Sequence, residues 1–261
     1  MTSTTLPPAA AKPPVHPLLQ PWLTRRVPAV MGVLNVTPDS FSDGGKFLAP
    51  DAARAQAAKL IADGADIIDI GAESTRPYGS QPVSAAEEMA RLRPVLADVV
   101  ALGMPVSIDS MKAEVVAFAL DTGVAIANDV WGLQRDPAMA EVVASYGVPV
   151  IVMHNRDAAD PAIDIMADIA MFFDRSLTIA AKAGVRQEQI VLDPGIGFGK
   201  TPEQSITVLA RLDELQRFGL PLLIGASRKR FIGTVSPSEP PQRRGGSIAA
   251  PLLAAPPGAQ S

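Results

Sequence analysis

The sequence contains no cysteine and only two histidines in 261 residues. Without cysteine it can form neither a disulfide bond nor a thiolate metal site. His154 has no second histidine or suitably spaced carboxylate for a zinc triad, and no serine lies in the Gly-x-Ser-x-Gly pattern of a nucleophile elbow. These absences argue against a disulfide scaffold, a zinc hydrolase and a serine hydrolase.

A positive charge excess and long apolar runs are also missing. The 23 Lys and Arg residues face 27 Asp and Glu residues, and the net charge of −4 leaves no basic face for nucleic acid. Apolar runs such as 148–153, interrupted by Pro149, are far shorter than the roughly 18 residues of a membrane span. The first residues also lack the charged and apolar regions of a secretory signal. We expect a cytoplasmic protein with neither nucleic acid nor a membrane as its partner.

The residues that are present suffice for one large domain. Apolar residues make up 48% of the chain and charged residues 19%, which is typical of globular proteins rather than disordered ones. Proline gathers at the two ends, within 1–28 and 237–261, and we expect these ends to be loose. The predicted organisation is a Pro-rich N-terminal tail over residues 1–28 and a single domain over residues 29–261.

Short apolar runs alternate along that domain with stretches of helical period. The predicted strands are 29–34, 66–70, 105–108, 124–127, 148–153, 189–192 and 221–224. The predicted helices are 54–62, 85–102, 112–120, 137–146, 163–183 and 202–218. Apolar strands separated by helices form a parallel sheet, either a closed barrel or an open doubly wound sheet.

Polar residues at nearly every strand exit favour the barrel. Such side chains converge on one point only if the strands form a ring, whereas an open sheet spreads them along an edge. We therefore predict an α/β fold of the TIM (β/α)8 type with its site at the C-terminal rim. The polar exits are Asn35, Glu73, Asp109, Asn128 with Asp129, His154, Asp193, and Ser227-Arg228-Lys229.

Asp109 and Asp193 are the first candidates for chemistry, because each follows a buried strand where an unpaired charge costs several kcal/mol. A single strand-end Asp can simply cap the next helix. Two such carboxylates with Asn35 and Asn128 at one rim favour a binding function instead. A carboxylate accepts two adjacent N–H groups and an amide offers both a donor and an acceptor, so this set suits the edge of a flat heterocycle.

Several loops at the same rim add candidates. The glycine-rich loop 195–199 ends at Lys200 and matches neither the P-loop nor the dinucleotide fingerprint, so it is either a ligand loop or a plain barrel loop. The cations 228–230 predict an anion site, with a solvated charge run as the alternative. Segments 35–45 and 71–77 are typical of lids. Trp131, Tyr78 and Phe198 either stack on a ring or pack in the core.

Six motifs, in order along the chain, resemble the dihydropteroate synthase family. They are MGVLNVTPDSFSDGG (31–45), DIIDIGAESTRP (66–77), SIDS (107–110), ANDV (127–130), LDPGIGFGK (192–200) and GASRK (225–229). The resemblance covers residues 29–250, and its first and last motifs separate it from other pterin-binding barrels. It implies a TIM-barrel transferase of folate biosynthesis that condenses 6-hydroxymethyl-7,8-dihydropterin diphosphate with 4-aminobenzoate and releases diphosphate.

The resemblance also implies roles for individual residues. Asp109, Asp193 and Lys229 are expected to be catalytic, and Asn35 is expected to ligate the Mg²⁺ that neutralises the diphosphate. The family further implies a homodimer. The substrate-binding residues that it implies are Thr75, Arg76, Asp109, Asn128, Asp193, Phe198, Ser227 and Lys229.

One departure from the family pattern lies near the C-terminus. After GSIAA the family continues a helix and then an eighth strand with an Arg-x-His pair, whereas this sequence reads PLLAAPPGAQS. Pro251 would interrupt that helix, so we expect the barrel to lack its eighth strand. Two other functions stay open: a pterin-binding protein without catalysis, and a methyltransferase that moves a methyl group from a folate to a corrinoid.

Overall fold

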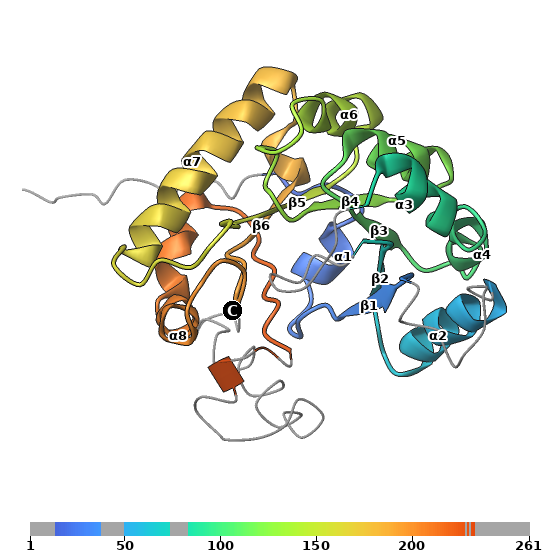
Figure 1. The fold of residues 1–261 in the computed structure, drawn as a ribbon, viewed down its shortest axis with the longest axis horizontal. Helices are drawn as coiled ribbons and strands as arrows, with labels where there is room; N and C mark the ends of the chain where they lie inside the picture. Colours follow the sequence, from blue (N-terminus) through green and yellow to red (C-terminus); the bar gives the residue numbers. More distant parts are fainter. Residues whose placement is uncertain (1–13, 38–49, 74–82, 228, 230, 233–261) are drawn as a thin grey trace, which may run out of the picture.

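The computed structural model describes residues 14–37, 50–73, 83–227, 229 and 231–232. Its centre is a six-stranded sheet whose strands follow the order of the chain (Figure 1). Every neighbouring pair is parallel. The strands are β1 (Met31–Asn35), β2 (Ile67–Gly71), β3 (Val106–Asp109), β4 (Ile126–Asp129), β5 (Val150–Met153) and β6 (Ile190–Asp193).

Helices between the strands cover the outer face of the curved sheet (Figure 1). This sequential, all-parallel arrangement with external helices confirms the predicted TIM-type fold. None of the described helices is both long and apolar enough to cross a bilayer. The helices are α2 (Pro50–Ala62), α3 (Ala85–Leu92), α4 (Leu96–Val100), α5 (Ala113–Asp121), α6 (Met139–Tyr146), α7 (Ile165–Ala183) and α8 (Pro202–Ala210), with 3-10 turns η1 (Gln187–Gln189) and η2 (Leu212–Phe218).

The seventh predicted strand, 221–224, is a single bridge rather than a full strand. Leu222 pairs in parallel with Leu192, whose N–H donates to the Pro221 carbonyl at 2.9 Å. The segment therefore lies beside β6 in the seventh position, but Pro221 has no N–H with which to extend the ladder. Within the described residues no strand joins this segment to β1. The expected loss of an eighth strand concerns residues 233–261, which lie outside the described residues.

Two predicted helices are divided in the structure. The predicted helix 85–102 is wrong in its middle, because Pro94 stands between α3 and α4 and cannot continue a helix. The predicted helix 202–218 consists of α8 followed by the 3-10 turn η2. The start of α8 is fixed by a capping box in which the Thr201 side chain and the Gln204 side chain each bond the other's backbone N–H.

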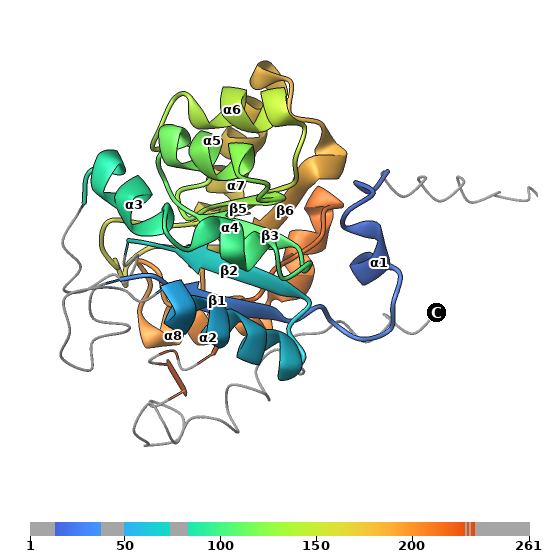
Figure 2. The same cartoon turned by 90° about the vertical axis from the view of Figure 1, so that its right-hand side faces the viewer.

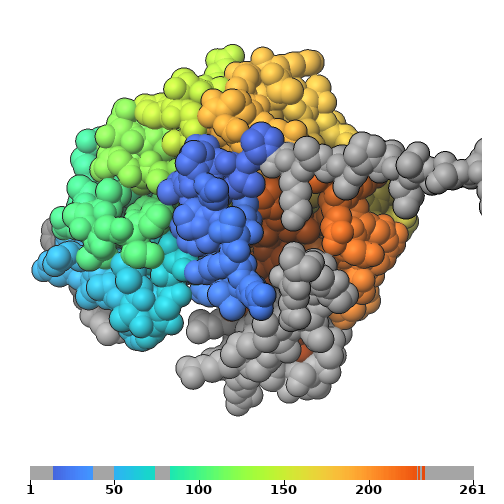
Figure 3. Space-filling view, turned by 180° about the vertical axis from the view of Figure 1, so that it is seen from behind, coloured from blue at the N-terminus to red at the C-terminus, as the bar shows by residue number. Residues whose placement is uncertain are grey.

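A short N-terminal helix, α1 (Gln20–Leu23), closes the end of the barrel where the strands begin (Figure 2). Trp22 and Leu18 pack against an inward-facing apolar layer that contains Ile67, Ile126 and Ile151. Seen from behind, the N-terminal segment lies across this face of the molecule (Figure 3). The tail expected to be loose is thus partly tied down over residues 14–28.

The two-residue period of the strands places polar side chains directly above that apolar layer. On β2, Ile67 in the apolar layer is followed two positions later by Asp69, and on β4 Ile126 is followed by Asn128. The residues between them, such as Ile68 and Ala127, belong to the main core of the protein. The interior of the barrel is therefore apolar near α1 and polar toward the strand exits.

Candidate functional site

Asp69, from the middle of β2, is a buried carboxylate in the barrel interior. It is 5% exposed and accepts a hydrogen bond from the Ser107 hydroxyl. The side-chain amide of Asn128 donates to Asp69 Oδ1 at 3.3 Å and to Asp69 Oδ2 at 3.1 Å. Burial raises the pKa of Asp69 to about 6, against the opposing effect of these two donors. Sequence reasoning missed this residue. The signal that was available is a lone carboxylate in the apolar strand 67–71.

Asp109 stands next to it at the end of β3. Its Oδ1 atom is buried and has no hydrogen-bond partner among the described residues. Burial and the negative charge of Asp69 raise the pKa of Asp109 well above its ordinary value. Gly71 leaves the space for this carboxylate, because a Cβ there would lie 3.3 Å from the Asp109 Cβ. An enclosed acceptor without a partner is a place where a ligand donor fits.

Asp193, at the end of β6, completes a group of three carboxylates. Its Oδ1 accepts a hydrogen bond of 2.7 Å from the Gly195 N–H. Burial raises the pKa of Asp193 to about 6, and the positive charge of Lys229 opposes that rise. Asp109 and Asp193 thus lie with Asp69 in one electrostatic cluster, as the sequence predicted for the first two.

Lys229 is the cation of this cluster. Burial lowers the pKa of Lys229, while Asp193 and Asp109 attract its positive charge and act in the opposite direction. Its Nζ lies 3.9 Å from the centroid of the Phe198 ring, a cation–π contact. Gly197 lets the lysine stem pass, since a Cβ there would lie 3.1 Å from the Lys229 Cδ.

Three carboxylates and one lysine form a centre with an excess of acceptors. The chemistry of such a centre suits a ring edge that carries several N–H donors and a ring on which positive charge develops. Asn128 lies in the same cluster through its bonds to Asp69.

Asn35 and Ser227 lie at the outer rim. Asn35 is exposed and stands opposite Gly71 in the β1–β2 register, and Ser227 is exposed two residues before Lys229. Asn35 offers an oxygen ligand for a metal ion. No group of three or more His, Asp or Glu side chains in the described part of the chain is arranged to hold one. Thr75 and Arg76 lie outside the described residues.

Asp129, another strand-end candidate, has a structural role. Asp129 is buried and accepts hydrogen bonds from the N–H groups of Trp131 and Leu133, at 2.9 and 2.7 Å, so it holds a turn. Trp131 stacks under the Arg135 guanidinium at 4.3 Å. Of the three aromatic candidates, Phe198 is in contact with the lysine of the cluster, and Tyr78 lies outside the described residues.

Comparison with known proteins agrees with this geometry. Residues 31–261 match the model of a family described as pterin binding enzyme. The chain is 47% identical over 225 residues to a dihydropteroate synthase of Bacillus subtilis, covering 86% of this chain and 78% of the relative.

Two solved structures are similar along most of the chain. A Clostridium difficile dihydropteroate synthase solved in the presence of pteroic acid has a TM-score of 0.82 and 49% identity, with 86% of each chain covered. A Xanthomonas albilineans dihydropteroate synthase with 4-aminobenzoic acid has a TM-score of 0.82 and 43% identity, covering 87% of this chain and 83% of that one.

Proposed function

Since the chain belongs to the pterin binding enzyme family, among its dihydropteroate synthases, we propose that it condenses 6-hydroxymethyl-7,8-dihydropterin diphosphate with 4-aminobenzoate. In this reaction the bond between the pterin CH₂ carbon and the diphosphate oxygen breaks, and its electron pair leaves with diphosphate. The amine nitrogen of 4-aminobenzoate forms the new C–N bond and loses a proton to solvent. The product is 7,8-dihydropteroate, an intermediate of folate synthesis.

The single observation that carries this proposal is the unpartnered, buried Oδ1 of Asp109 beside Asp69 and Asp193. The pterin ring edge offers adjacent N–H donors from its amino group and ring nitrogens, which complement these acceptors. Each charge-assisted bond contributes about 1.5 to 3 kcal/mol. Asp109, Asp193 and Asn128 would then orient the ring, and the carboxylates would stabilise the positive charge that develops as diphosphate departs.

Lys229 and Phe198 are proposed to line the same ring on another side. The ammonium of Lys229 has donors for the carbonyl and ring-nitrogen acceptors of the pterin. No protein nucleophile is required, because the amine of 4-aminobenzoate attacks directly. The contribution of the protein is positioning and charge stabilisation.

Mg²⁺ is the proposed cofactor. The residues fit it in donor chemistry: Asn35 supplies a hard oxygen at the exposed rim, and Mg²⁺ commonly takes its other ligands from substrate phosphates and water. Bound there, it would neutralise charge on the departing diphosphate. Thr75, Arg76 and Ser227 are proposed to contact the diphosphate and 4-aminobenzoate.

The proposed reaction is tested by measuring diphosphate release from the purified chain with and without 4-aminobenzoate and Mg²⁺. We expect release only when both are present, and at least about a hundredfold loss in Asp109→Asn, in line with two lost contacts. The matched control is Asp213→Asn, which changes an exposed carboxylate on η2 and should leave the rate unchanged. Methyl transfer to a corrinoid without diphosphate release would overturn the proposal. Pterin binding without product would support the non-catalytic alternative.

We also propose that the protein works in the cytoplasm and as a homodimer. The charged diphosphate substrate does not cross membranes unaided, which supports an intracellular site of reaction. Met171 on α7 and Ile206 on the adjacent α8 are exposed apolar residues, which supports a contact surface for a second copy. Light scattering of the wild type against Met171→Glu checks the dimer, which should dissociate in the variant.

A further inference from the structure

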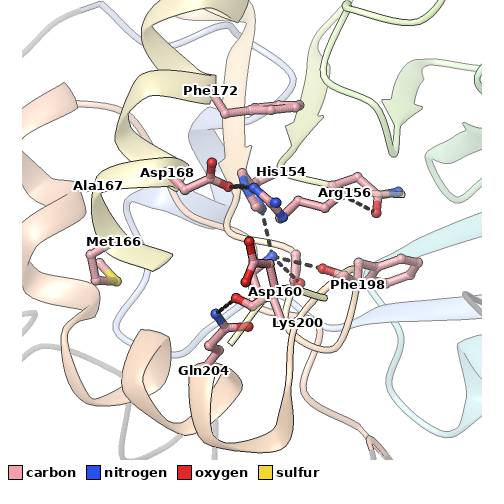
Figure 4. Close-up of polar contacts among 12 residues, drawn as sticks. His154, Arg156, Asp160, Met166, Ala167, Asp168, Phe172, Phe198, Lys200 and Gln204 are labelled. Atoms are coloured by element: carbon pink, nitrogen blue, oxygen red, sulfur yellow. Dashed lines mark hydrogen bonds and ion pairs between the residues drawn. The ribbon is translucent and has the colours of Figure 1, made fainter. Parts of the chain in front are cut away.

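A second buried polar network lies behind the glycine loop 195–199 (Figure 4), beside the carboxylate cluster, since Lys200 and Asp193 attract each other. Its centre is Lys200, which is 7% exposed. The Nζ atom of Lys200 is 2.7 Å from His154 Nδ1, 2.8 Å from the Gly195 carbonyl oxygen and 3.1 Å from the Phe198 carbonyl oxygen. An ammonium group has three donors, so all three are used by these partners.

The hydrogen bonds determine the state of His154. Its Nδ1 accepts from Lys200, so its proton is on Nε2, which donates to Asp168 Oδ2 at 3.0 Å. Burial, and then the charge of Lys200, lower the pKa of His154 to about 3, so the ring is neutral. Asp168, in the first turn of α7, also pairs with Arg156 at 2.8 Å. The ring of Phe172 packs edge-on against the imidazole of His154, with the two ring centroids 4.9 Å apart.

This network connects helix α7 to the loop that carries Phe198. The loop also lies in direct contact with the segment after β5. A Cβ on Gly195 would lie 1.9 Å from the His154 carbonyl oxygen, and a Cβ on Gly199 would lie 2.4 Å from the Arg156 Cβ. The Phe198 ring, on the same loop, is in contact with the Lys229 ammonium. The position of the loop therefore determines the position of Phe198 and, through its contact with that ring, the position of the Lys229 ammonium.

We propose that Lys200, held through His154 by Asp168, is a positioning residue that sets the geometry of Phe198 and Lys229 for the pterin. This inference rests on the proposed function and deepens it, because none of the three network residues needs to touch substrate. The network acts through the backbone carbonyls of Gly195 and Phe198. Its loss should weaken pterin binding while the 4-aminobenzoate KM and the overall fold change little.

The test compares two substitutions of His154 that differ in hydrogen bonding. His154→Gln keeps an acceptor for Lys200 and a donor for Asp168, whereas His154→Leu fills a similar volume and has neither. Lys200→Met is the second disruptive variant. The Kd of pteroic acid is measured by titration calorimetry, and the KM of each substrate by diphosphate release. Circular dichroism checks that each variant is folded.

We expect His154→Leu and Lys200→Met to raise the pteroic acid Kd and the KM of the pterin substrate about tenfold or more. His154→Gln should stay within about threefold of the wild type. Equal affinity in the Gln and Leu variants, whether tight or weak, would overturn the inference. If His154→Leu does not fold, wild-type affinity in Lys200→Met would overturn it equally. Failure of the wild type to bind pteroic acid would instead overturn the proposed function.

Discussion

At the residue scale, the buried carboxylate of Asp193 lowers the free energy of unfolding of the ligand-free protein at neutral and alkaline pH. The carboxyl pKa rises from 3.8 to about 6 on folding, so its contribution to stability is fully present below pH 4 and is lost as the pH rises through 6. We predict that Asp193→Asn is more stable than the ligand-free wild type by roughly 1 to 3 kcal/mol at pH 8. The gain should shrink as the pH falls toward 4. Denaturant unfolding across this range measures it.

The same substitution should abolish detectable pteroic acid binding, because the amide presents an N–H where the ligand needs an acceptor. Asp213→Asn, on the surface, should change neither the stability profile nor the affinity. Parallel pH profiles for Asp193→Asn and the wild type would show that Asp193 is not destabilised by burial.

His154 gives a second prediction at this scale. With its pKa lowered to about 3 by burial and by the charge of Lys200, it should remain a neutral Nε2–H imidazole from pH 8 down to pH 5. Nitrogen NMR of the imidazoles checks this, and the spectrum is simple because the chain has only two histidines. In Lys200→Met the positive charge is gone, so the pKa of His154 should rise. Protonation of the wild-type ring above pH 5 would contradict the hydrogen-bond assignment.

The sequence predicted some of these residues better than others. Asp109 and Asp193 were predicted because they stand at strand ends, where polar residues gather. Asp69 was missed because it lies within a strand, and only the β2–β3–β4 register brings it to Ser107 and Asn128. Asp129 has the same strand-end signal as Asp109 but only holds a turn. A position at the end of a strand therefore predicts that a residue lies at the rim. Its role can be assigned only when it is known whether its side chain points into the barrel.

The glycine loop supplies a prediction at the scale of elements. Gly195 and Gly184 both have positive φ, at 65° and 88°. A Cβ would lie 1.9 Å from the His154 carbonyl oxygen at Gly195, but it would meet nothing within 4 Å at Gly184. We predict that Gly184→Ala lowers the free energy of unfolding by about 1 kcal/mol and leaves activity intact. Gly195→Ala should lower stability further and abolish diphosphate release.

Both variants are compared by denaturant unfolding and by the release assay. The pair separates backbone strain, which the two share, from displacement of the loop, which only Gly195→Ala should cause. Wild-type activity in Gly195→Ala would show that the loop position is not needed for the reaction.

Individual residues such as proline indicate where a helix ends more accurately than the spacing of apolar residues does. Pro94 was visible in the sequence and explains the end of the predicted long helix. Helix α1 could not be predicted, because it has four residues within a proline-rich tail. Its position depends on Trp22 packing under the barrel and on the ion pair between Arg25 and Asp66, both of which are tertiary contacts.

At the scale of the whole molecule, a pterin bound at the proposed site should stabilise the entire barrel, because that site combines carboxylates from β2, β3 and β6. At a concentration about 100 times its Kd, a ligand adds about 2.7 kcal/mol to the free energy of unfolding. For a chain of this size we expect pteroic acid to raise the Tm by about 5 to 10 °C. Scanning calorimetry measures the shift. The same pteroic acid concentration should leave the Tm of Asp193→Asn unchanged.

The order of the parallel strands in a TIM-type fold was predicted correctly because polar residues follow nearly every predicted strand, a property of the whole chain rather than of one motif. The seventh position is only a bridge at Leu222, since Pro221 cannot donate to a ladder. That difference involves one residue and does not alter the order of the strands. The fold class could therefore be predicted from the repeated alternation of strands and helices. The contacts of each side chain could not, because they depend on the register between strands.

The position of α1 under the strand starts has a practical consequence. Asp109 and Asp193 end strands β3 and β6, and α1 lies at the opposite end of the barrel, where the strands begin (Figure 2). A protein immobilised on a sensor chip or resin through residues that precede α1 would therefore expose the end of the barrel that holds the carboxylates to the flowing solution.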